Sequence, residues 1–369
     1  MEITMKDQDR ACPMKKTSIG GQALIEGIMM RGPKRTAMAV RDTEGEIVLE
    51  AWDNVPEGKK KSALDTLKKI PVIRGAINFV SSMKTGYKCL MRSAEIAGLE
   101  ELEEEERRLK EAKKAEKKRK KENAEGAVEA EKPIDSADSD EAPSVASEQK
   151  EKGADGGSSA LMVIVGVISM VLALGLALVL FLWLPSFLYE LLSKAIPSIA
   201  DNRFLKSAFE GILKIAVLVA YMGLVSLMKD IRRTFMYHGA EHKTIFCYEA
   251  GLELTVENVR GQRRFHPRCG TSFLIVMVLV GIFIGFLIPG DLPTAIRVAI
   301  KILLLPVTMG LGYEFIKLAG KHDNAVTRIL SAPGLLMQRI TVLEPTDDMI
   351  ECAIAAVKEV IPEDGSDRI

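Results

Sequence analysis

Long runs of apolar residues in the second half of the chain predict helices that cross a membrane. Residues 160–184 contain no charged side chain. A helix of 25 residues is long enough to cross a hydrocarbon core of roughly 30 Å. Three further runs, at residues 208–228, 272–288 and 295–318, are interrupted by only a few charges. The pattern therefore predicts a membrane α-helical protein with four transmembrane helices.

The polar and helix-bending residues within these runs are few. Glu210 and Lys214 lie four residues apart in the second run, a spacing at which they can form an ion pair. Glu314, near the end of the fourth run, is expected to pair with an arginine at the membrane interface rather than to bind a metal. Pro306 and Gly312 are expected to kink the fourth helix.

Loop charges predict how the helices are oriented. The loop at residues 229–271 carries eight lysines and arginines, whereas the loop at residues 185–207 carries three. Loops rich in basic residues stay on the cytoplasmic side. The long basic loop is therefore expected in the cytoplasm, and four spans then place both termini there as well.

The first 99 residues predict a small cytoplasmic α+β module. Residues 18–52 have the pattern of β-strands, with a hairpin turn at residues 42–45. Two helices are expected to follow, at residues 61–70 and 72–97, and the second has an apolar stripe. This stripe is expected to pack on the sheet or the membrane helices, and the alternative is that it lies on the membrane surface.

The remaining divisions follow from composition. Residues 100–157 are rich in charged and small residues and predict a largely disordered linker. The membrane domain is expected at residues 158–320, and a cytoplasmic C-terminal segment at residues 321–369.

Composition also excludes two classes of protein. The 50 basic and 50 acidic residues, with 5% aromatics, do not predict a nucleic-acid-binding surface, and five scattered cysteines do not predict a disulfide framework.

One group of residues has the pattern of a metal-binding or catalytic site. His238, Glu241 and His242 have the H-x-x-E-H spacing of inverted zinc proteases, in which two imidazoles one helical turn apart share a face. His266 and Cys269 follow in the same basic loop, just before the third apolar run. These histidines and the cysteine are the ligand types that zinc prefers. The sequence predicts a zinc site with His238, His242, His266 and Cys269 as ligands and Glu241 as a general base.

Two forms of this site remain open. Four ligands would make a closed structural site, whereas three ligands and a water molecule would make a catalytic one. A third interpretation needs no metal: the histidines only form hydrogen bonds, and Cys269 is a small buried apolar residue.

Four segments resemble the YqhQ-type family of bacterial multi-pass membrane proteins, which is catalogued as domain of unknown function 1385. They read GGQALIEGIMMRGP, YHGAEHKTIFCYEAG, FHPRCGTSF and PGLLMQRITVLEPTDDMIECAIAAVK. The resemblance covers residues 18–360 apart from the charged insert, and the family is labelled a predicted metal-dependent enzyme. It implies a bacterial plasma-membrane location, His238, His242, His266 and Cys269 as candidate ligands, and no established substrate.

Two functions are compatible with these features. The first is a metal-dependent hydrolase that acts at the membrane surface. The second is a non-enzymatic scaffold or biogenesis factor with a structural metal site, which recruits a membrane or cytoplasmic protein partner. A transporter fits less well, since four spans are few. The lipid bilayer is an expected partner in each case. Gly281 and Gly285 form a GxxxG face on which a helix of the same chain, or alternatively of a second copy, can pack.

Overall fold

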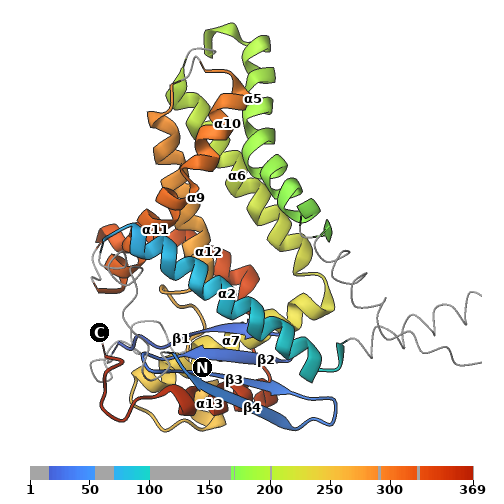
Figure 1. Cartoon of the computed structure of the whole chain (residues 1–369), viewed down its shortest axis with the longest axis vertical. Coiled ribbons are helices and arrows are strands. Elements are labelled where there is room, and N and C mark those ends of the chain that lie inside the picture. The colour runs from blue at the N-terminus through green and yellow to red at the C-terminus, as the bar shows by residue number, and fades with distance from the viewer. Residues whose placement is uncertain are drawn as a thin grey trace, which may run out of the picture. The chain divides into compact units, whose positions relative to one another are not determined.

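The computed structural model describes residues 16–54, 70–99, 168–169, 171–199, 202–289, 292–321 and 325–368 (Figure 1). The chain divides into two compact units, Met1–Gly98 with Ala177–Ile369, and Leu99–Leu176. The sheet and the candidate site belong to the first unit. The predicted linker at residues 100–157 lies outside the described residues, as does the predicted helix at 61–70 except for its last residue.

The N-terminal strands form an antiparallel sheet in which each strand pairs with the next. The strands are β1 (Gly20–Leu24), β2 (Gly27–Arg31), β3 (Arg35–Arg41) and β4 (Ile47–Asp53). The predicted hairpin joins β3 to β4. The Asp42 carboxylate accepts hydrogen bonds from the backbone N–H groups of Glu44 and Glu46, and Gly45 adopts a positive φ of 89°. Asx-type turn bonds and a left-handed glycine are what the turn sequence predicts.

Both faces of the sheet are covered. Ile28, Met30, Ala37 and Ala39 on one face share a core with α7 (Lys229–Glu249), α8 (Val256–Arg260) and α13 (Asp347–Val360). Leu24, Met29, Met38 and Val40 on the other face pack against Cys89 of α2 (Ile73–Ile96). This alternation is the two-residue period of a strand. The predicted N-terminal module therefore shares its core with the basic loop and with the C-terminal segment.

Helix α2 joins the sheet to the apolar helices. Its Arg74 holds the Glu314 carboxylate of α11 (Leu305–Lys321) with two hydrogen bonds, from Nε (2.6 Å) and from Nη2 (2.5 Å). This is the arginine pair expected for Glu314. Val80 and Tyr87 on the outer face of α2 are 63% and 65% exposed. The apolar stripe is thus only partly used for packing within the chain.

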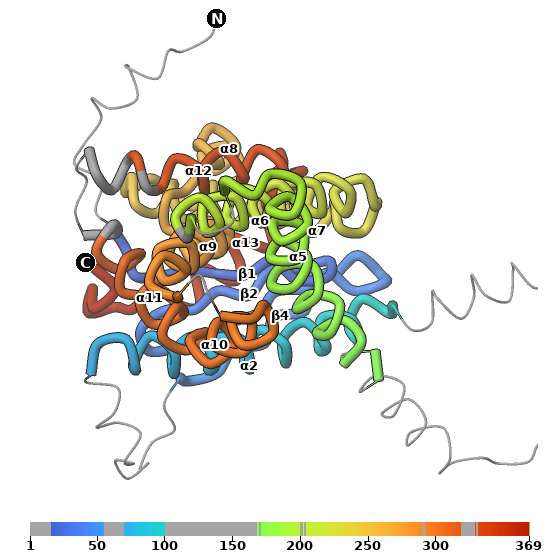
Figure 2. The backbone as a smooth tube through the Cα atoms, turned by 90° about the horizontal axis from the view of Figure 1, so that it is seen from above, coloured from blue at the N-terminus to red at the C-terminus, as the bar shows by residue number. Residues whose placement is uncertain are grey.

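The remaining helices are strongly apolar. The π-helix η2 (Val179–Trp183) continues into α5 (Leu184–Ala195), which is followed by the 3₁₀ turn η3 (Pro197–Ile199), α6 (Arg203–Val225), α9 (Gly270–Leu287), α10 (Thr294–Leu303), α11 and α12 (Ala325–Thr341). Three stretches, Val171–Ala195, Phe204–Val225 and Gly270–Leu287, are long and apolar enough to cross a membrane. Helices α10 and α11 form a fourth if a bend of 51° is accepted within one span. Helix α9 lies among α6, α11 and α12 (Figure 2).

Local sequence explains the bend and one close contact. The helix breaks at Leu304, two residues before Pro306, because proline has no N–H for the carbonyl four residues earlier and clashes with it. Gly312 lies inside α11 and admits the side chains of Phe273 and Met277 of α9. Gly285 of the GxxxG face lies against Ser207 of α6. Helix α6 of the same chain therefore packs against Gly285.

Candidate metal centre

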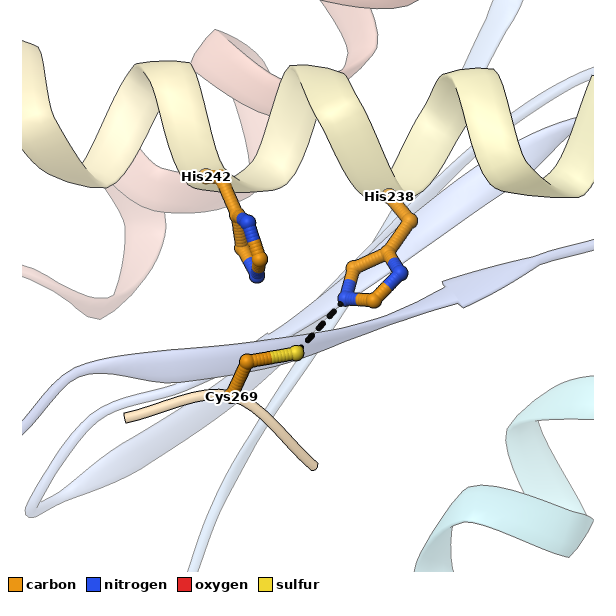
Figure 3. A group of neighbouring side chains, drawn as sticks. All are labelled: His238, His242 and Cys269. Carbon is orange, nitrogen blue, oxygen red and sulfur yellow. Dashed lines mark hydrogen bonds between the residues drawn. The ribbon is translucent and has the colours of Figure 1, made fainter. Parts of the chain in front are cut away.

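The two candidate ligands on α7 lie on one face, and a glycine between them fixes their surroundings. His238 and His242 are four residues apart, so both imidazoles project from the same side of the helix (Figure 3). A Cβ atom on Gly239 would lie 1.9 Å from the carbonyl oxygen of Leu343. Only glycine lets the segment after α12 approach α7 this closely. This approach brings the carbonyl of Thr341 to His238.

The third candidate ligand comes from the beginning of α9. Cys269 is the N-cap residue of α9, and its Sγ accepts a hydrogen bond from the backbone N–H of Thr271 at 3.4 Å. Its Sγ also lies 3.0 Å from Nε2 of His238. One ligand atom each of His238, His242 and Cys269 lies within 4.8 Å of the others (Figure 3). The structure thus brings together three of the four ligands predicted from the sequence.

Backbone carbonyls hold both imidazoles of this group. Nδ1 of His238 lies 2.9 Å from the carbonyl oxygen of Thr341, and Nδ1 of His242 lies 2.5 Å from that of Arg264. A carbonyl only accepts hydrogen bonds, so each Nδ1 must carry a proton, which in a neutral imidazole leaves the Nε2 lone pair for a metal. Metal-binding histidines are commonly oriented by such partners. The donor set of two imidazole nitrogens and one thiol therefore fits a zinc ion.

His266 lies outside this group of ligand atoms. Its ring centroid is 5.6 Å from that of His242 and 4.6 Å from that of Phe246. Its Nδ1 accepts the backbone N–H of Arg268 at 3.2 Å, and its Nε2 lies 3.9 Å from the Glu249 carboxylate. Burial lowers the pKa of His266 to about 4, so the ring is neutral at neutral pH. The structure thus places this predicted ligand beside Glu249 rather than beside Cys269.

Two side chains that the sequence did not single out position His266. Gln338 of α12 accepts a hydrogen bond from the backbone N–H of His266 (2.8 Å) and donates one to its carbonyl oxygen (2.7 Å). Glu249 accepts hydrogen bonds from Arg268 and from the backbone N–H of Thr17. Burial opposes its ionisation, but these partners and His266 outweigh burial and hold the pKa of Glu249 below its ordinary value. No local sequence pattern links these distant residues.

The predicted base, Glu241, is buried and faces the sheet. Its Oε1 accepts the backbone N–H of Gly21 in β1 at 2.9 Å. Burial raises its pKa, although the nearby His238 and the hydrogen bond from Gly21 oppose the shift. Glu241 is not among the residues whose ligand atoms lie within 4.8 Å of one another. The structure therefore connects it to β1 and places it near His238, outside that group.

The segment that contains Gly21 is a structural part of the site. Its β1–β2 turn holds Glu26 at a positive φ of 48°, and the Glu26 carboxylate forms a two-bond ion pair with Arg233 of α7. Tyr237 donates a further hydrogen bond to Glu26 at 3.3 Å. The segment GGQALIEGIMMRGP, at residues 20–33, thus fixes α7 to the sheet.

Comparisons with known proteins agree with the resemblance seen in the sequence. Residues 70–363 match a family described as "Protein of unknown function (DUF1385)". The chain is 33% identical over 344 residues to the uncharacterized protein YqhQ of Bacillus subtilis (strain 168), a match that covers 93% of this chain and 92% of that protein. No solved structure matches the chain. The protein therefore belongs to the DUF1385 family of proteins of unknown function.

Proposed function

We propose that the protein is a multi-pass membrane protein with a zinc-dependent hydrolase site at the cytoplasmic membrane surface. The observation that carries the proposal is the cluster of His238, His242 and Cys269, whose ligand atoms lie within 4.8 Å of one another. Backbone carbonyls orient both imidazoles of the cluster. Three protein ligands are typical of catalytic zinc sites, in which the fourth position takes water or substrate.

The surfaces of the apolar helices support insertion into a bilayer. Leu172, Ile212, Phe283 and Leu287 are each more than 60% exposed, although they lie in the three most apolar helices. A soluble protein rarely exposes apolar surface of this extent. Lipid tails would cover these side chains.

The path of the chain favours four crossings. The sheet shares a core with α7 and α13, so these elements lie on one side of the bilayer. The two stretches before α7 leave that side and return to it, and α9 leaves it again. The chain must return once more before α13, which requires the bent pair α10 and α11 to act as one span. The basic loop then assigns this side to the cytoplasm.

The chain supplies the other groups that a hydrolase needs. A bound zinc ion would supply Lewis-acid activation of water or of a substrate carbonyl or phosphoryl group. Glu241 would accept the proton of the attacking water at Oε2, which has no hydrogen-bond partner among the described residues, and then transfer it to the leaving group. Its raised pKa suits this role, because a base works best with a pKa near the working pH. A substrate with a polar head at the bilayer surface would reach the site.

Metal analysis of the detergent-purified protein tests the ligands. We expect about one zinc per wild-type chain and a strong loss of metal in His238→Ala, His242→Ala and Cys269→Ala, because three-ligand sites depend on every ligand. Cys247→Ala is the matched control, since Cys247 is also a buried thiol, lies on α7, and donates only to the Glu253 carbonyl. Wild-type protein that binds no zinc after purification with added zinc would exclude the proposed site.

A structural zinc site is the second candidate, and the position of Glu241 favours it. The carboxylate already binds Gly21 and so helps to hold α7 on the sheet. Glu241→Gln distinguishes the two functions by hydrolysis of p-nitrophenyl acetate and bis(p-nitrophenyl) phosphate. A hydrolase would lose at least about 100-fold in rate and keep its zinc. A structural site would show no zinc-dependent hydrolysis in the wild type, and chelation would unfold the protein.

A further inference from the structure

A second group of charged side chains lies within the apolar helices. Lys206, Glu210 and Lys214 recur every four residues on α6, and Arg297 and Lys301 do the same on α10, so each set lies on one helical face. Glu210 lies 15 residue steps (225 − 210) from the end of α6, which correspond to about 22 Å of helix. This group is therefore remote from α7 and independent of the proposed zinc site.

The one carboxylate of this group is already paired. Glu210 accepts hydrogen bonds from Ser186 at 2.8 Å and from Lys301, and both Glu210 and Lys301 are buried. The partner predicted for Glu210 from spacing, Lys214 on the same helix, does not form an ion pair with it among the described contacts. Lys301 of α10 binds the carboxylate instead. Because Lys301 lies on another helix, the spacing of residues within α6 could not predict this partner. The remaining cations form no hydrogen bond or ion pair with this carboxylate among the described contacts.

Arg297 is a buried cation without a counter-ion among the described residues. Its side chain is fully buried, and Nη1 donates to the carbonyl oxygen of Pro289 at 2.7 Å. Its Nε and Nη2 have no hydrogen-bond partner among the described residues, and neither does the buried hydroxyl of Ser207. An arginine stays charged in proteins, and an unpaired charge among apolar helices is costly. The fork formed by Nε and Nη2 therefore lacks a hydrogen-bond acceptor within the described ranges.

The same fork holds carboxylates elsewhere in this chain. Arg74, Arg233 and Arg260 each use Nε and Nη2 to bind both oxygens of a carboxylate, of Glu314, Glu26 and Asp347 respectively. This side-on arrangement suits carboxylate and phosphate equally. In Arg297 the same two atoms lack an acceptor in the described part of the chain, which points to an oxyanion from outside the chain.

Neighbouring charges also favour an anion. Lys206 is buried, contacts the Tyr189 ring at 5.8 Å, and forms no ion pair among the described residues. Arg297 lies close enough to Lys206 and Lys214 for like charges to repel. With Lys301, the group holds four cations and one carboxylate; Glu190 of α5 is near enough to Lys206 to count as a second carboxylate, which leaves an excess of two positive charges.

We propose that Arg297 and Lys206 bind a phosphate group between the first turns of α6 and α10. The guanidinium fork would donate to two phosphate oxygens, and Lys206 would supply the second positive charge. The phosphate group would belong either to the headgroup of an anionic phospholipid or to free inorganic phosphate. Both sources present the same oxygens, so the experiment is designed to separate them.

Binding is measured on the full chain in detergent, as a saturable rise in the thermal unfolding midpoint. One arm uses sodium phosphate against sodium chloride at equal ionic strength. The other uses dioctanoyl phosphatidylglycerol against dioctanoylglycerol, which has the same chains and no phosphate. Arg297→Gln should weaken binding at least tenfold. The matched control is Lys194→Gln, a cation at the end of α5 whose side chain is 73% exposed.

Each outcome bears on the proposal. Stabilisation by the phospholipid alone supports a headgroup site, and stabilisation by phosphate supports a site for the free anion. If Arg297→Gln does not fold, Lys206→Gln replaces it and should show the same loss. The proposal is overturned if neither probe stabilises the wild type saturably, or if Arg297→Gln and Lys206→Gln respond as the wild type does.

Discussion

Close backbone contact at Gly239 sets the position of the first candidate ligand. The segment after α12 passes so near α7 that the Leu343 carbonyl oxygen occupies the space of a side chain at position 239. Leu343 also donates its backbone N–H to the Phe235 carbonyl at 2.9 Å. These contacts bring the Thr341 carbonyl to Nδ1 of His238. The tautomer of His238 therefore depends on Gly239, because only glycine permits the close contact.

Gly239→Ala should therefore destabilise the protein by at least about 2 kcal/mol, because the new methyl group meets backbone atoms that cannot move freely. Thermal or denaturant unfolding in detergent measures the change, and zinc content should fall with it. Gly223→Ala on α6 is the control, since nothing lies within 4 Å of the added Cβ atom. That variant should be neutral or more stable by about 0.5–1 kcal/mol. Equal stability of both variants would contradict the proposed close contact.

The buried pair of Glu249 and Arg268 makes a second prediction at this scale. Glu249→Gln should cost about 3–5 kcal/mol, because it leaves the Arg268 guanidinium in a largely buried position without its counter-ion. Glu351→Gln removes an exposed partner of Arg41 and should cost less than about 1 kcal/mol. Chemical denaturation of the two variants against the wild type gives the comparison. Similar losses would show that Glu249 is not a structural anchor.

At the scale of elements, the sequence predicted those features of the site that depend on residues close together in the chain. Helix α7 ends at Glu249, and Gly251 follows it with a φ of 68°, the left-handed conformation that favours glycine after a helix. The spacing of His238 and His242 placed both rings on one face. Helical period and glycine conformation are local properties, and for this reason they can be read from a single sequence.

The rest of the site depends on distant segments. His266 and Cys269 are three residues apart, yet the turn between them sends one ring toward Glu249 and the thiol toward His238. Gln338 holds this turn from α12, 72 residues further along the chain. Glu241 similarly meets Gly21, 220 residues away. A spacing pattern cannot reveal such partners, so the set of four ligands and the role of Glu241 as base stay predictions.

Gln338→Ala tests how α12 positions the loop. We expect a loss of about 1–3 kcal/mol, because the buried backbone N–H and carbonyl of His266 lose their partners. Zinc content should remain near that of the wild type if only His238, His242 and Cys269 bind the ion. Gln262→Ala removes a hydrogen bond within one helical turn and serves as the control. Loss of zinc in Gln338→Ala at temperatures where it is folded would make His266 a ligand.

At the scale of the whole molecule, the two ends of the described chain meet. Thr17 donates its hydroxyl to the Asp367 carboxylate at 2.6 Å, and Ser18 donates its backbone N–H to the Asp367 carbonyl. Tyr248 of α7 binds the same carboxylate at 3.0 Å. In a chain inserted as proposed, ends that touch would lie on one side of the bilayer, so the number of crossings would be even.

Alkaline phosphatase fusions measure this topology, because the enzyme is active only outside the cytoplasm. Fusions after residues 199 and 289 should be active, and fusions after residues 260 and 369 should be inactive, as four spans with a cytoplasmic sheet require. Green fluorescent protein at the same positions should give the opposite pattern and serves as the control. An active fusion after residue 369 would instead indicate an odd number of spans.

The last helix of the chain has a consequence for biosynthesis. Helix α13 covers one face of the sheet, so β1–β4 are synthesised well before the helix that completes their core. A chain that stopped before Asp347 would keep α5–α12 but lack the α13 part of the core under one sheet face and the Asp367 acceptor of the Thr17 hydroxyl. Truncation just before Asp347 should therefore destabilise the sheet and make the product a target of cellular proteases.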